Sequence, residues 1–284
     1  MTTSAHPAAL QSTESAASST VDPAPAVAHA ARHRLLTLAG SQSVHLGSSL
    51  SVVDILVAVY RETGLTAATL EDNGRDRIIL SKGHAVWAMY AVLASLGICQ
   101  FNDDLALPGH PADGTPGVDV ATGALGHGPS IAAGLVEAGR LTGHDRRVFV
   151  IVGDGELNEG SVWEAAMFAA HRRLGRLVII VDLNGLQQEG RTCDVLDLAP
   201  LEDKWRAFGW HVATVDGHDH DALALCLQQT RIDDNQPTVV LARTVKGKGV
   251  RFMEHDPRWH VARLSPTQLA SALHLLSDSA VTGA

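Results

Sequence analysis

Two apolar runs in the middle of the chain each end at a polar residue. One is VFVIVGDG over residues 148–155, and the other is RLVIIVDLN over residues 176–184. Continuous Val and Ile residues are typical of strands buried on both faces of a parallel sheet. The segment between the runs has apolar residues at helical spacing, with Arg172 and Arg173 in its last turn, where cations suit the helix dipole. The pattern therefore predicts a strand–helix–strand unit with a right-handed crossover.

Patterns elsewhere extend this unit into a larger sheet. Helices are predicted over residues 28–40, from Ser49 or Ser51 through Tyr60, from His84, and over 130–142, about 200–208, 221–231 and 264–276, and strands over 77–80, 210–215 and 237–245. The expected fold class is α/β, with a doubly wound, mostly parallel sheet and helices on both faces. Residues 1–26 are rich in Ala, Ser, Thr and Pro and predict a disordered tail without a secretory signal, followed by one domain over residues 27–284.

Composition narrows the range of partners and compartments. The 284 residues carry a formal net charge of −9 and no long basic run, which argues against nucleic acid or an anionic membrane as the main partner. No stretch reaches about 18 uninterrupted apolar residues, so we expect no membrane span. Cys99, Cys193 and Cys226 are far apart in the sequence, and we expect reduced thiols in a cytoplasmic protein.

Asp154 and Asn184 come at the ends of the two central strands, and ligands of such sheets bind beyond the carboxyl ends of strands. Mg²⁺ prefers hard oxygen ligands and usually keeps positions for phosphate and water. Gly153 and Gly155 flank the aspartate and allow close approach of a bulky anion, to which the first amides of the next helix can donate. We therefore predict a divalent metal that holds a diphosphate. Turn residues at the ends of an ordinary sheet are the alternative.

The order GDG, helix, strand and asparagine resembles the thiamine diphosphate motif of transketolases. This resemblance implies a thiamine diphosphate-binding fold whose Mg²⁺ is held by Asp154, Asn184 and the main-chain carbonyl of Leu186. The metal in turn would hold the diphosphate of the cofactor. The resemblance also implies cofactor contacts from Glu156 and from the backbone of Gly155.

Four histidines match further transketolase segments. His45 lies in a loop that resembles GHPGG or GHLGG, His84 in SKGHA, His110 in PGHP and His260 in WH. The resemblance implies catalytic roles at the sugar for His45, His110 and His260, and diphosphate contacts for His84 and His260. Imidazoles near neutral pH are suited to supplying protons and polarising sugar oxygens. From the residues alone, a solvated loop histidine at 45 and a structural helix cap at 84 are the alternatives.

Residues 122–128, TGALGHG, resemble the segment whose backbone lines the cofactor in transketolases. The resemblance implies that Gly123, Leu125 and Gly126 contact the cofactor. A nicotinamide cofactor is a weaker alternative, because the glycine spacing and the absence of a following acidic residue do not fit a dinucleotide fingerprint.

Some positions have competing explanations or depart from the family. Glu159 matches an acidic residue near the dimer interface that is thought to link paired active sites, which makes it a fourth catalytic candidate. A first-turn glutamate favoured by the helix dipole is an equal alternative.

Val44 stands where the family usually has glycine, and His127 stands where it has glutamine. The residues after His260 also differ from the family pattern.

Two polar segments later in the chain are expected to have ordinary structural roles rather than functional ones. Lys246, Lys248 and Arg251 are spaced by glycines and are expected to be mainly solvated rather than to steer phosphates. The run DGHDHD, residues 216–221, is expected to be a solvated turn and helix cap rather than a metal cluster.

The resemblance covers residues 28–276, which correspond only to the first domain of a transketolase. In that family a second domain carries the pyrimidine pocket, the glutamate that activates the cofactor and the contacts to a sugar phosphate. We therefore expect the N-terminal, diphosphate-binding subunit of a two-subunit transketolase, inactive alone. Its expected partners are a C-terminal subunit with that glutamate, a second copy in an α₂β₂ heterotetramer, and sugar phosphates.

The expected reaction is transfer of a two-carbon ketol unit from a ketose to an aldehyde. One alternative is another thiamine-dependent acyloin or two-carbon transfer, to a different acceptor or carrier in a specialised pathway. A second is a non-catalytic cofactor-binding or regulatory subunit, which would not need the retained Asp154, Asn184, His84 and His260. A nicotinamide dehydrogenase comes last.

Overall fold

The computed structural model describes residues 23–98, 107–230 and 233–282. Within these residues, one sheet contains five parallel strands in the order β1-β2-β3-β5-β4. The strands are β1 (Arg77–Leu80), β2 (Val148–Gly153), β3 (Leu177–Leu183), β4 (His211–Asp216) and β5 (Thr238–Arg243). The predicted α/β class with a parallel sheet is confirmed.

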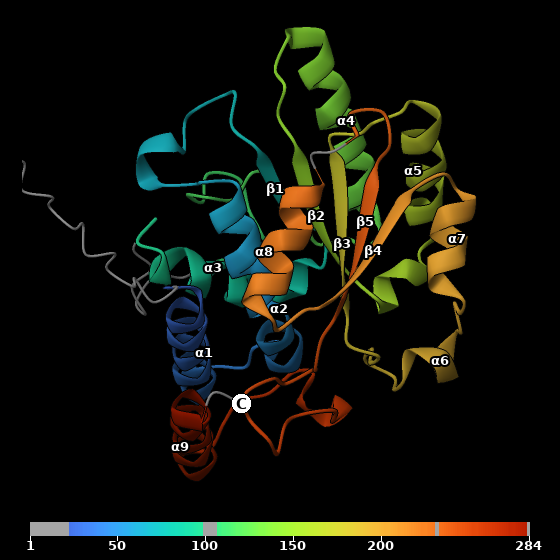
Figure 1. The fold of residues 1–284 in the computed structure, drawn as a ribbon. Coiled ribbons are helices and arrows are strands. Elements are labelled where there is room, and N and C mark those ends of the chain that lie inside the picture. The colour runs from blue at the N-terminus through green and yellow to red at the C-terminus, as the bar shows by residue number, and fades with distance from the viewer. Residues whose placement is uncertain (1–22, 99–106, 231–232, 283–284) are drawn as a thin grey trace, which may run out of the picture.

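Helices cover both faces of the sheet (Figure 1). One group consists of α2 (Leu46–Glu62), α3 (Val86–Ser95) and α8 (His220–Gln229), with α1 (Pro23–Ser41) packed on α2 and α3, and α9 (Pro266–Thr282) packed on α1. The other consists of α4 (His127–Thr142), α5 (Gly160–His171) and α7 (Leu201–Ala207). The short α6 (Thr192–Val195) and 3₁₀ turns at Ala67–Thr69, Gly83–Ala85, Gly155–Asn158 and Pro257–Trp259 lie in the connections.

The central strands are buried on both faces, as their unbroken apolar runs predict. Along β2, Phe149 and Ile151 belong to the core shared with the α1–α3 side. Val148, Val150 and Val152 belong to the second core, shared with α4, α5 and α7. Because side chains alternate along a strand, one continuous Val/Ile run supplies both cores.

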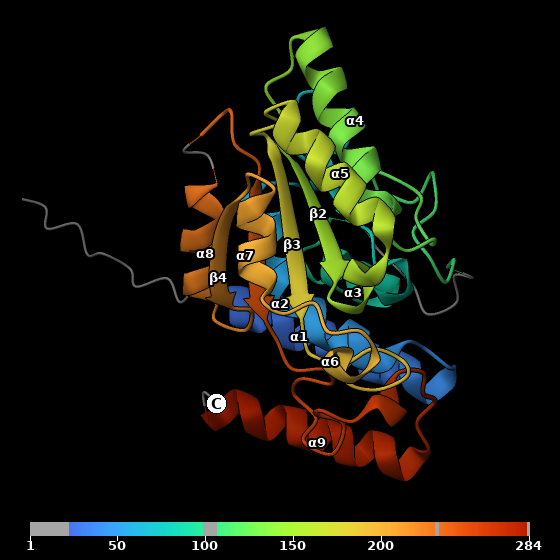
Figure 2. The ribbon, with the colours of Figure 1, turned by 90° about the vertical axis from the view of Figure 1, so that its right-hand side faces the viewer.

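The carboxyl ends of the strands meet at one edge of the sheet, near α6 and the start of α2 (Figure 2). In the parallel register, Gly153 of β2 lies opposite Asp182 of β3, and Leu183 of β3 lies opposite Arg243 of β5. The residues that follow these strands are therefore brought together at a single edge. This edge is the place where the sequence predicts a ligand.

Several boundaries differ from the predicted ones. α1 begins at Pro23, four residues before the predicted start of the domain at 27, because proline is well tolerated in the first turn of a helix. α4 begins at His127 rather than 130, and a 3₁₀ turn at Gly155–Asn158 precedes α5, so the helix after GDG starts later than expected. The predicted tail up to residue 22, Cys99 and residue 231 lie outside the described residues.

Among residues 23–98, 107–230 and 233–282, none of the helices is both long and apolar enough to cross a membrane.

A buried ion pair joins α1 to α2. Arg32 Nη1 donates to Asp54 Oδ1 at 3.0 Å, and the side chains are 9% and 3% exposed. Burial alone would raise the pKa of Asp54, but the Arg32 guanidinium and hydrogen bonds from His218 and His220 hold that pKa well below its usual range. Asp54 is therefore the anionic centre of a cluster formed by three segments of the chain.

We predict that Asp54→Asn lowers the free energy of unfolding by about 3–5 kcal/mol near neutral pH, because it leaves the Arg32 charge buried without a partner. The folded-state pKa is depressed, so the contribution of Asp54 is present above its unfolded pKa of about 4 and is lost as the pH falls through the folded value. Urea unfolding curves of the wild type and the variant should converge in acid. Asp203→Asn, at a side chain that is 70% exposed, is the control and should leave stability unchanged. Equal curves for Asp54→Asn and wild type at pH 7 would contradict the prediction.

Candidate functional site

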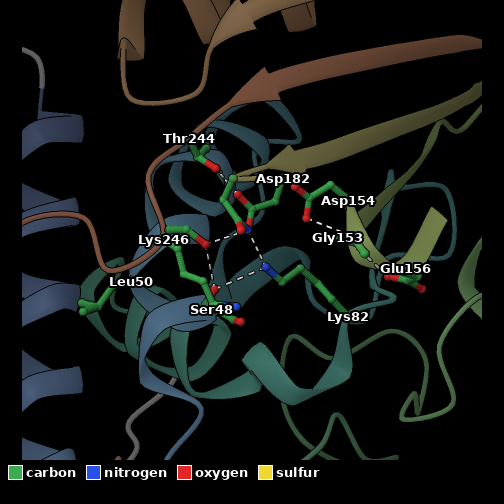
Figure 3. Close-up of polar contacts among 12 residues, drawn as sticks. Ser48, Leu50, Lys82, Gly153, Asp154, Glu156, Asp182, Thr244 and Lys246 are labelled. Carbon is green, nitrogen blue, oxygen red and sulfur yellow. Dashed lines mark hydrogen bonds and ion pairs between the residues drawn. The ribbon is translucent and has the colours of Figure 1, made fainter. Parts of the chain in front are cut away.

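Asp154 lies directly after β2, where the sequence places it (Figure 3). Its carboxylate accepts hydrogen bonds from the backbone amides of Gly155 at 2.9 Å and Gly185 at 2.5 Å. Burial, and then the nearby charge of Asp182, raise the pKa of Asp154 to about 6. Each carboxylate oxygen can still accept further contacts. A cation placed here would relieve the repulsion between the two carboxylates.

Asn184 lies just beyond β3 and is mostly buried. Its side-chain oxygen accepts from the Leu186 amide at 3.1 Å, and its side-chain nitrogen donates to Asp182 at 3.3 Å. The turn at residues 184–186 also brings Asn184 close to Asp154, because the amide of Gly185, the next residue, donates to the Asp154 carboxylate. The donor set at this edge consists of hard oxygens, which fits Mg²⁺.

Asp182 and Lys82 form a buried ion pair at the centre of the edge (Figure 3). Asp182 is 0% exposed and Lys82 is 2% exposed. The carboxylate also accepts from Ser51 at 2.7 Å and from Thr244. Burial would raise the pKa of Asp182, but the Lys82 ammonium and these hydrogen bonds outweigh it and hold the pKa below its usual value. The pair connects the ends of β1, β3 and β5 with α2.

Lys246 is buried, and the prediction that it is mainly solvated is wrong. Its side chain passes beside Gly47 at the start of α2, where a Cβ would lie 3.2 Å from Lys246 Cγ. Its ammonium donates to the Leu186 carbonyl at 3.1 Å. Burial, and then the Lys82 charge, lower its pKa to about 8. Lys248 is partly exposed and Arg251 is exposed, as predicted.

The contact between Lys246 and Leu186 bears on the predicted metal ligands. The carbonyl of Leu186 is the oxygen that the transketolase resemblance assigns to Mg²⁺, and here it accepts from an ammonium group. A carbonyl oxygen has two lone pairs, so one donor does not exhaust its capacity. One of the oxygens predicted to bind the metal is therefore already in contact with a cationic side chain.

His45, His84 and His260 form a cluster beside these residues. Their ring centroids are 5.3, 5.4 and 5.6 Å apart in the three pairs. Burial, reinforced by the neighbouring lysines and histidines, lowers the pKa of all three, to about 2 for His84 and about 4 for His260. The imidazoles are thus neutral near pH 7. His260 Nδ1 is buried without a hydrogen-bond partner in the described part of the chain, as expected of a group that serves a ligand.

Val44 joins two of the histidine loops. Its amide and carbonyl exchange hydrogen bonds with Ala262 at 3.0 and 2.9 Å, and its side chain is 1% exposed in the core. This short antiparallel bridge holds His45 and His260 on neighbouring segments. Valine at this position therefore anchors the loop. His127, a second departure from the family pattern, is exposed at the start of α4.

His110 and the glycine loop lie on the open side of the cluster. His110 is exposed, but its charge is one cause of the lowered pKa of His45, and a Cβ on Gly123 would lie 3.5 Å from its ring. Gly126 has a φ of +80°, and a Cβ there would lie 2.5 Å from Ser161 Oγ, so the turn requires glycine. Leu125 is 37% exposed.

The two glutamates after GDG differ in their surroundings. Glu156 is buried and accepts from Ser81 and from the amides of Gly126 at 2.8 Å and Gly153 at 3.1 Å. It therefore joins the ends of β1 and β2 to the start of α4, and burial raises its pKa. Glu159 is exposed at the start of α5, and its side chain makes no capping hydrogen bond.

Sequence reasoning missed Lys82, Asp182 and Thr244 as members of this site. A signal was present in the run RLVIIVDLN, because an aspartate within a buried strand requires a charged or hydrogen-bonding partner. Nothing in the local sequence identifies that partner, since Lys82 lies 100 residues earlier.

Comparison with known proteins identifies relatives of this chain. Residues 28–276 match the family described as "Transketolase, thiamine diphosphate binding domain". A 6-deoxy-6-sulfo-D-fructose transketolase subunit of Clostridium sp. (strain MSTE9) is 39% identical over 240 residues, which are 81% of this chain and 86% of that protein. An apulose-4-phosphate transketolase subunit of Actinobacillus succinogenes is 39% identical over 262 residues, which are 88% of this chain and 95% of that protein.

Solved structures agree with the family match. A transketolase from Leishmania mexicana superimposes with a TM-score of 0.77 at 25% identity, covering 92% of this chain and 45% of that one. A mutant transketolase from Pichia stipitis gives a TM-score of 0.76 at 25% identity, covering 89% of this chain and 40% of that one. The chain thus spans less than half of these solved transketolases but most of the two subunits.

We predict that His84 makes the folded protein less stable as the pH falls below neutral. Because its pKa is about 2 in the folded state, only the unfolded chain gains this proton as the pH falls below about 6.5, and stability falls with it. His84→Asn should reduce the slope of unfolding free energy against pH between 4 and 6 by up to about 1.4 kcal/mol per pH unit, measured by urea unfolding without added ligand. The raised pKa of Asp154 acts in the opposite direction, so the difference between variant and wild type is the informative quantity. Parallel profiles for the two proteins would contradict a neutral buried His84.

Proposed function

The chain belongs to the family of transketolase thiamine diphosphate binding domains, and we propose that it is the diphosphate-binding subunit of a two-subunit transketolase. The observation that carries the proposal is the convergence of Asp154 and Asn184 with two buried lysines and three neutral histidines at one edge of the sheet. Two relatives named as transketolase subunits support the division into two chains, because this chain spans 86% and 95% of their lengths.

In this proposal Asp154, Asn184 and the Leu186 carbonyl hold Mg²⁺ at the ends of β2 and β3. Burial and the charge of Asp182 raise the pKa of Asp154 to about 6. A bound dication would favour the charged carboxylate and so lower this pKa. The cations Lys82 and Lys246 and the backbone at Gly155 would then oppose the negative charge of a diphosphate. These residues fit a metal-bound diphosphate in both charge and ligand type.

The bound cofactor would supply a thiazolium that stabilises the carbanion needed for ketol transfer. The chain itself supplies imidazoles for proton handling. With lowered pKa values, His45 and His260 are neutral near pH 7 and can each accept one hydrogen bond and donate another to sugar oxygens. His110, exposed beside Gly123, would approach a substrate from the open side.

The proposed partners would supply the parts of the active site that belong to the second transketolase domain. A C-terminal subunit would contribute the pyrimidine pocket, the activating glutamate and the contacts to a sugar phosphate. Self-association to an α₂β₂ heterotetramer is part of the proposal, and it is supported by α5, where Glu159 is exposed and Met167 and Phe168 are 50% and 48% exposed. Cytoplasmic residence is also proposed, in keeping with the free thiols of Cys193 and Cys226.

The relatives are named for different sugars, 6-deoxy-6-sulfo-D-fructose and apulose-4-phosphate. We therefore propose transfer of a two-carbon unit from a ketose to an aldehyde or a carrier, with the donor and the acceptor to be identified by a screen on the assembled pair. A non-catalytic subunit has less support, because desolvating three histidines and two lysines around two strand ends is costly without a ligand.

We predict that the purified chain binds thiamine diphosphate only in the presence of Mg²⁺. Asp154→Ala should weaken this binding at least about 100-fold, because it removes a metal ligand, and isothermal titration calorimetry measures the change directly. Asp203→Ala, at an exposed position on α7, is the matched control and should bind as the wild type does. Binding that is independent of Mg²⁺, or unaltered in Asp154→Ala, would overturn the assignment of the metal site. Binding of NAD without thiamine diphosphate would favour the dehydrogenase alternative.

A further inference from the structure

His218 lies in the turn between β4 and α8, and its imidazole bridges two distant segments. Nδ1 is 2.7 Å from Asp54 Oδ2, and the backbone amide of Val245 donates to Nε2 at 2.8 Å. The side chains of His218 and His220 are only 11% and 14% exposed, so the prediction of a solvated turn is wrong for both histidines. The predicted helix cap is present, because Asp219 accepts from Ala222 at 2.9 Å.

The backbone contact fixes the chemical form of His218. A backbone N–H can only donate, so Nε2 must be unprotonated to accept from Val245. The proton of the neutral ring is then on Nδ1, where it is donated to Asp54. A single tautomer therefore satisfies both contacts, and the ring orientation is set at both ends.

Asp54 is a fixed point for this contact. Its carboxylate is 3% exposed and is held by Arg32 from α1 and by His220 Nε2 at 3.3 Å. His220 shares the carboxylate, but among the described residues it makes no hydrogen bond to Val245, whose amide donates to His218, and its Nδ1 is buried without a partner. The two histidines therefore differ at the ring nitrogen that faces away from Asp54: it has a hydrogen-bond partner in His218 and none in His220 among the described residues.

Val245 is the residue between two side chains of the candidate cofactor site. β5 ends at Arg243, and beyond it Thr244 donates to Asp182 and Lys246 donates to the Leu186 carbonyl. The turn closes tightly on this segment, since the Gly217 amide donates to the Arg243 carbonyl at 2.7 Å and a Cβ on Gly217 would lie 2.5 Å from Thr244 Cγ2.

We propose that His218 is a positioning residue for the cofactor site. By anchoring the Val245 amide to the Asp54 cluster, it fixes the backbone direction from which Thr244 reaches Asp182 and Lys246 reaches the Leu186 carbonyl. His218 itself touches none of Asp154, Asn184 and Leu186 in the structure, so it acts through the β5 end and takes no part in the chemistry. The identity of the bound group rests on the proposed function, whereas the anchoring of Val245 does not.

A pair of amide variants separates the two contacts of His218. Asn can place its amide nitrogen where Nδ1 lies and keep Asp54, but it is too short to reach Val245. Gln extends one bond further and can offer an oxygen to the Val245 amide. We expect His218→Asn to increase hydrogen exchange at the Val245 amide at least tenfold and to weaken binding of thiamine diphosphate with Mg²⁺ by about 10- to 100-fold, as loss of a group that orients ligand-binding residues typically does. His218→Gln should recover most of both.

His220→Asn is the matched control, since it alters the other imidazole on the same carboxylate. We expect it to change the melting temperature without changing exchange at Val245 or affinity by more than about twofold. Equal effects of His218→Asn and His220→Asn on exchange and affinity would overturn the proposal, because both would then act only through Asp54. Exchange at Val245 that stays at the wild-type level in His218→Asn would overturn it as well.

Failure of the proposed function gives a different result. If the wild type binds no thiamine diphosphate with Mg²⁺, either alone or together with its partner subunit, the cofactor assignment falls, but hydrogen exchange at Val245 still decides whether His218 anchors the β5 end. If His218→Asn does not fold, His218→Gln carries the test. Exchange at Val245 that stays at the wild-type rate in a folded His218→Gln supports the anchor. Tenfold faster exchange in that variant contradicts the claim that a hydrogen-bond acceptor at position 218 protects the Val245 amide.

Discussion

The buried ion pair between Lys82 and Asp182 is the interaction on which the edge of the sheet depends. Both side chains are almost completely removed from water, so neither charge could be tolerated there alone. The pair joins the segment after β1 to the carboxyl end of β3, and Ser51 from α2 and Thr244 from the end of β5 complete the hydrogen bonding of the carboxylate. Four elements from distant parts of the sequence therefore meet at one carboxylate.

The charges around this pair explain the other properties of the site. The anionic Asp182 raises the pKa of Asp154, and the cationic Lys82 contributes to the lowered pKa values of Lys246 and His84. The edge thus contains a carboxylate that favours a nearby cation and histidines that remain neutral. Both conditions suit a metal-bound diphosphate next to groups that exchange protons with a sugar.

Much of the fold follows from local patterns. The Val/Ile runs of β2 and β3 predict their burial, and the polar residues that end these runs predict the functional edge. The missing information is of longer range. The partners of Asp182 and of His218 lie 100 and 164 residues away, and a glycine-spaced lysine such as Lys246 has no local feature that distinguishes a buried conformation from a solvated one. The pattern at residues 216–221 predicted a turn and a helix cap, but it could not show that the imidazole of His218 points inward to Asp54.

This domain is proposed to work with a second chain that completes the cofactor site. Affinity capture of the tagged chain from its native cells, with the partners identified by mass spectrometry, is the most informative test. We expect a stoichiometric partner that contains a pyrimidine-binding domain with its glutamate, and ketol transfer by the captured pair when thiamine diphosphate and Mg²⁺ are supplied. Capture of the chain without such a partner, together with no ketol transfer, would show that it does not act as half of a two-subunit transketolase.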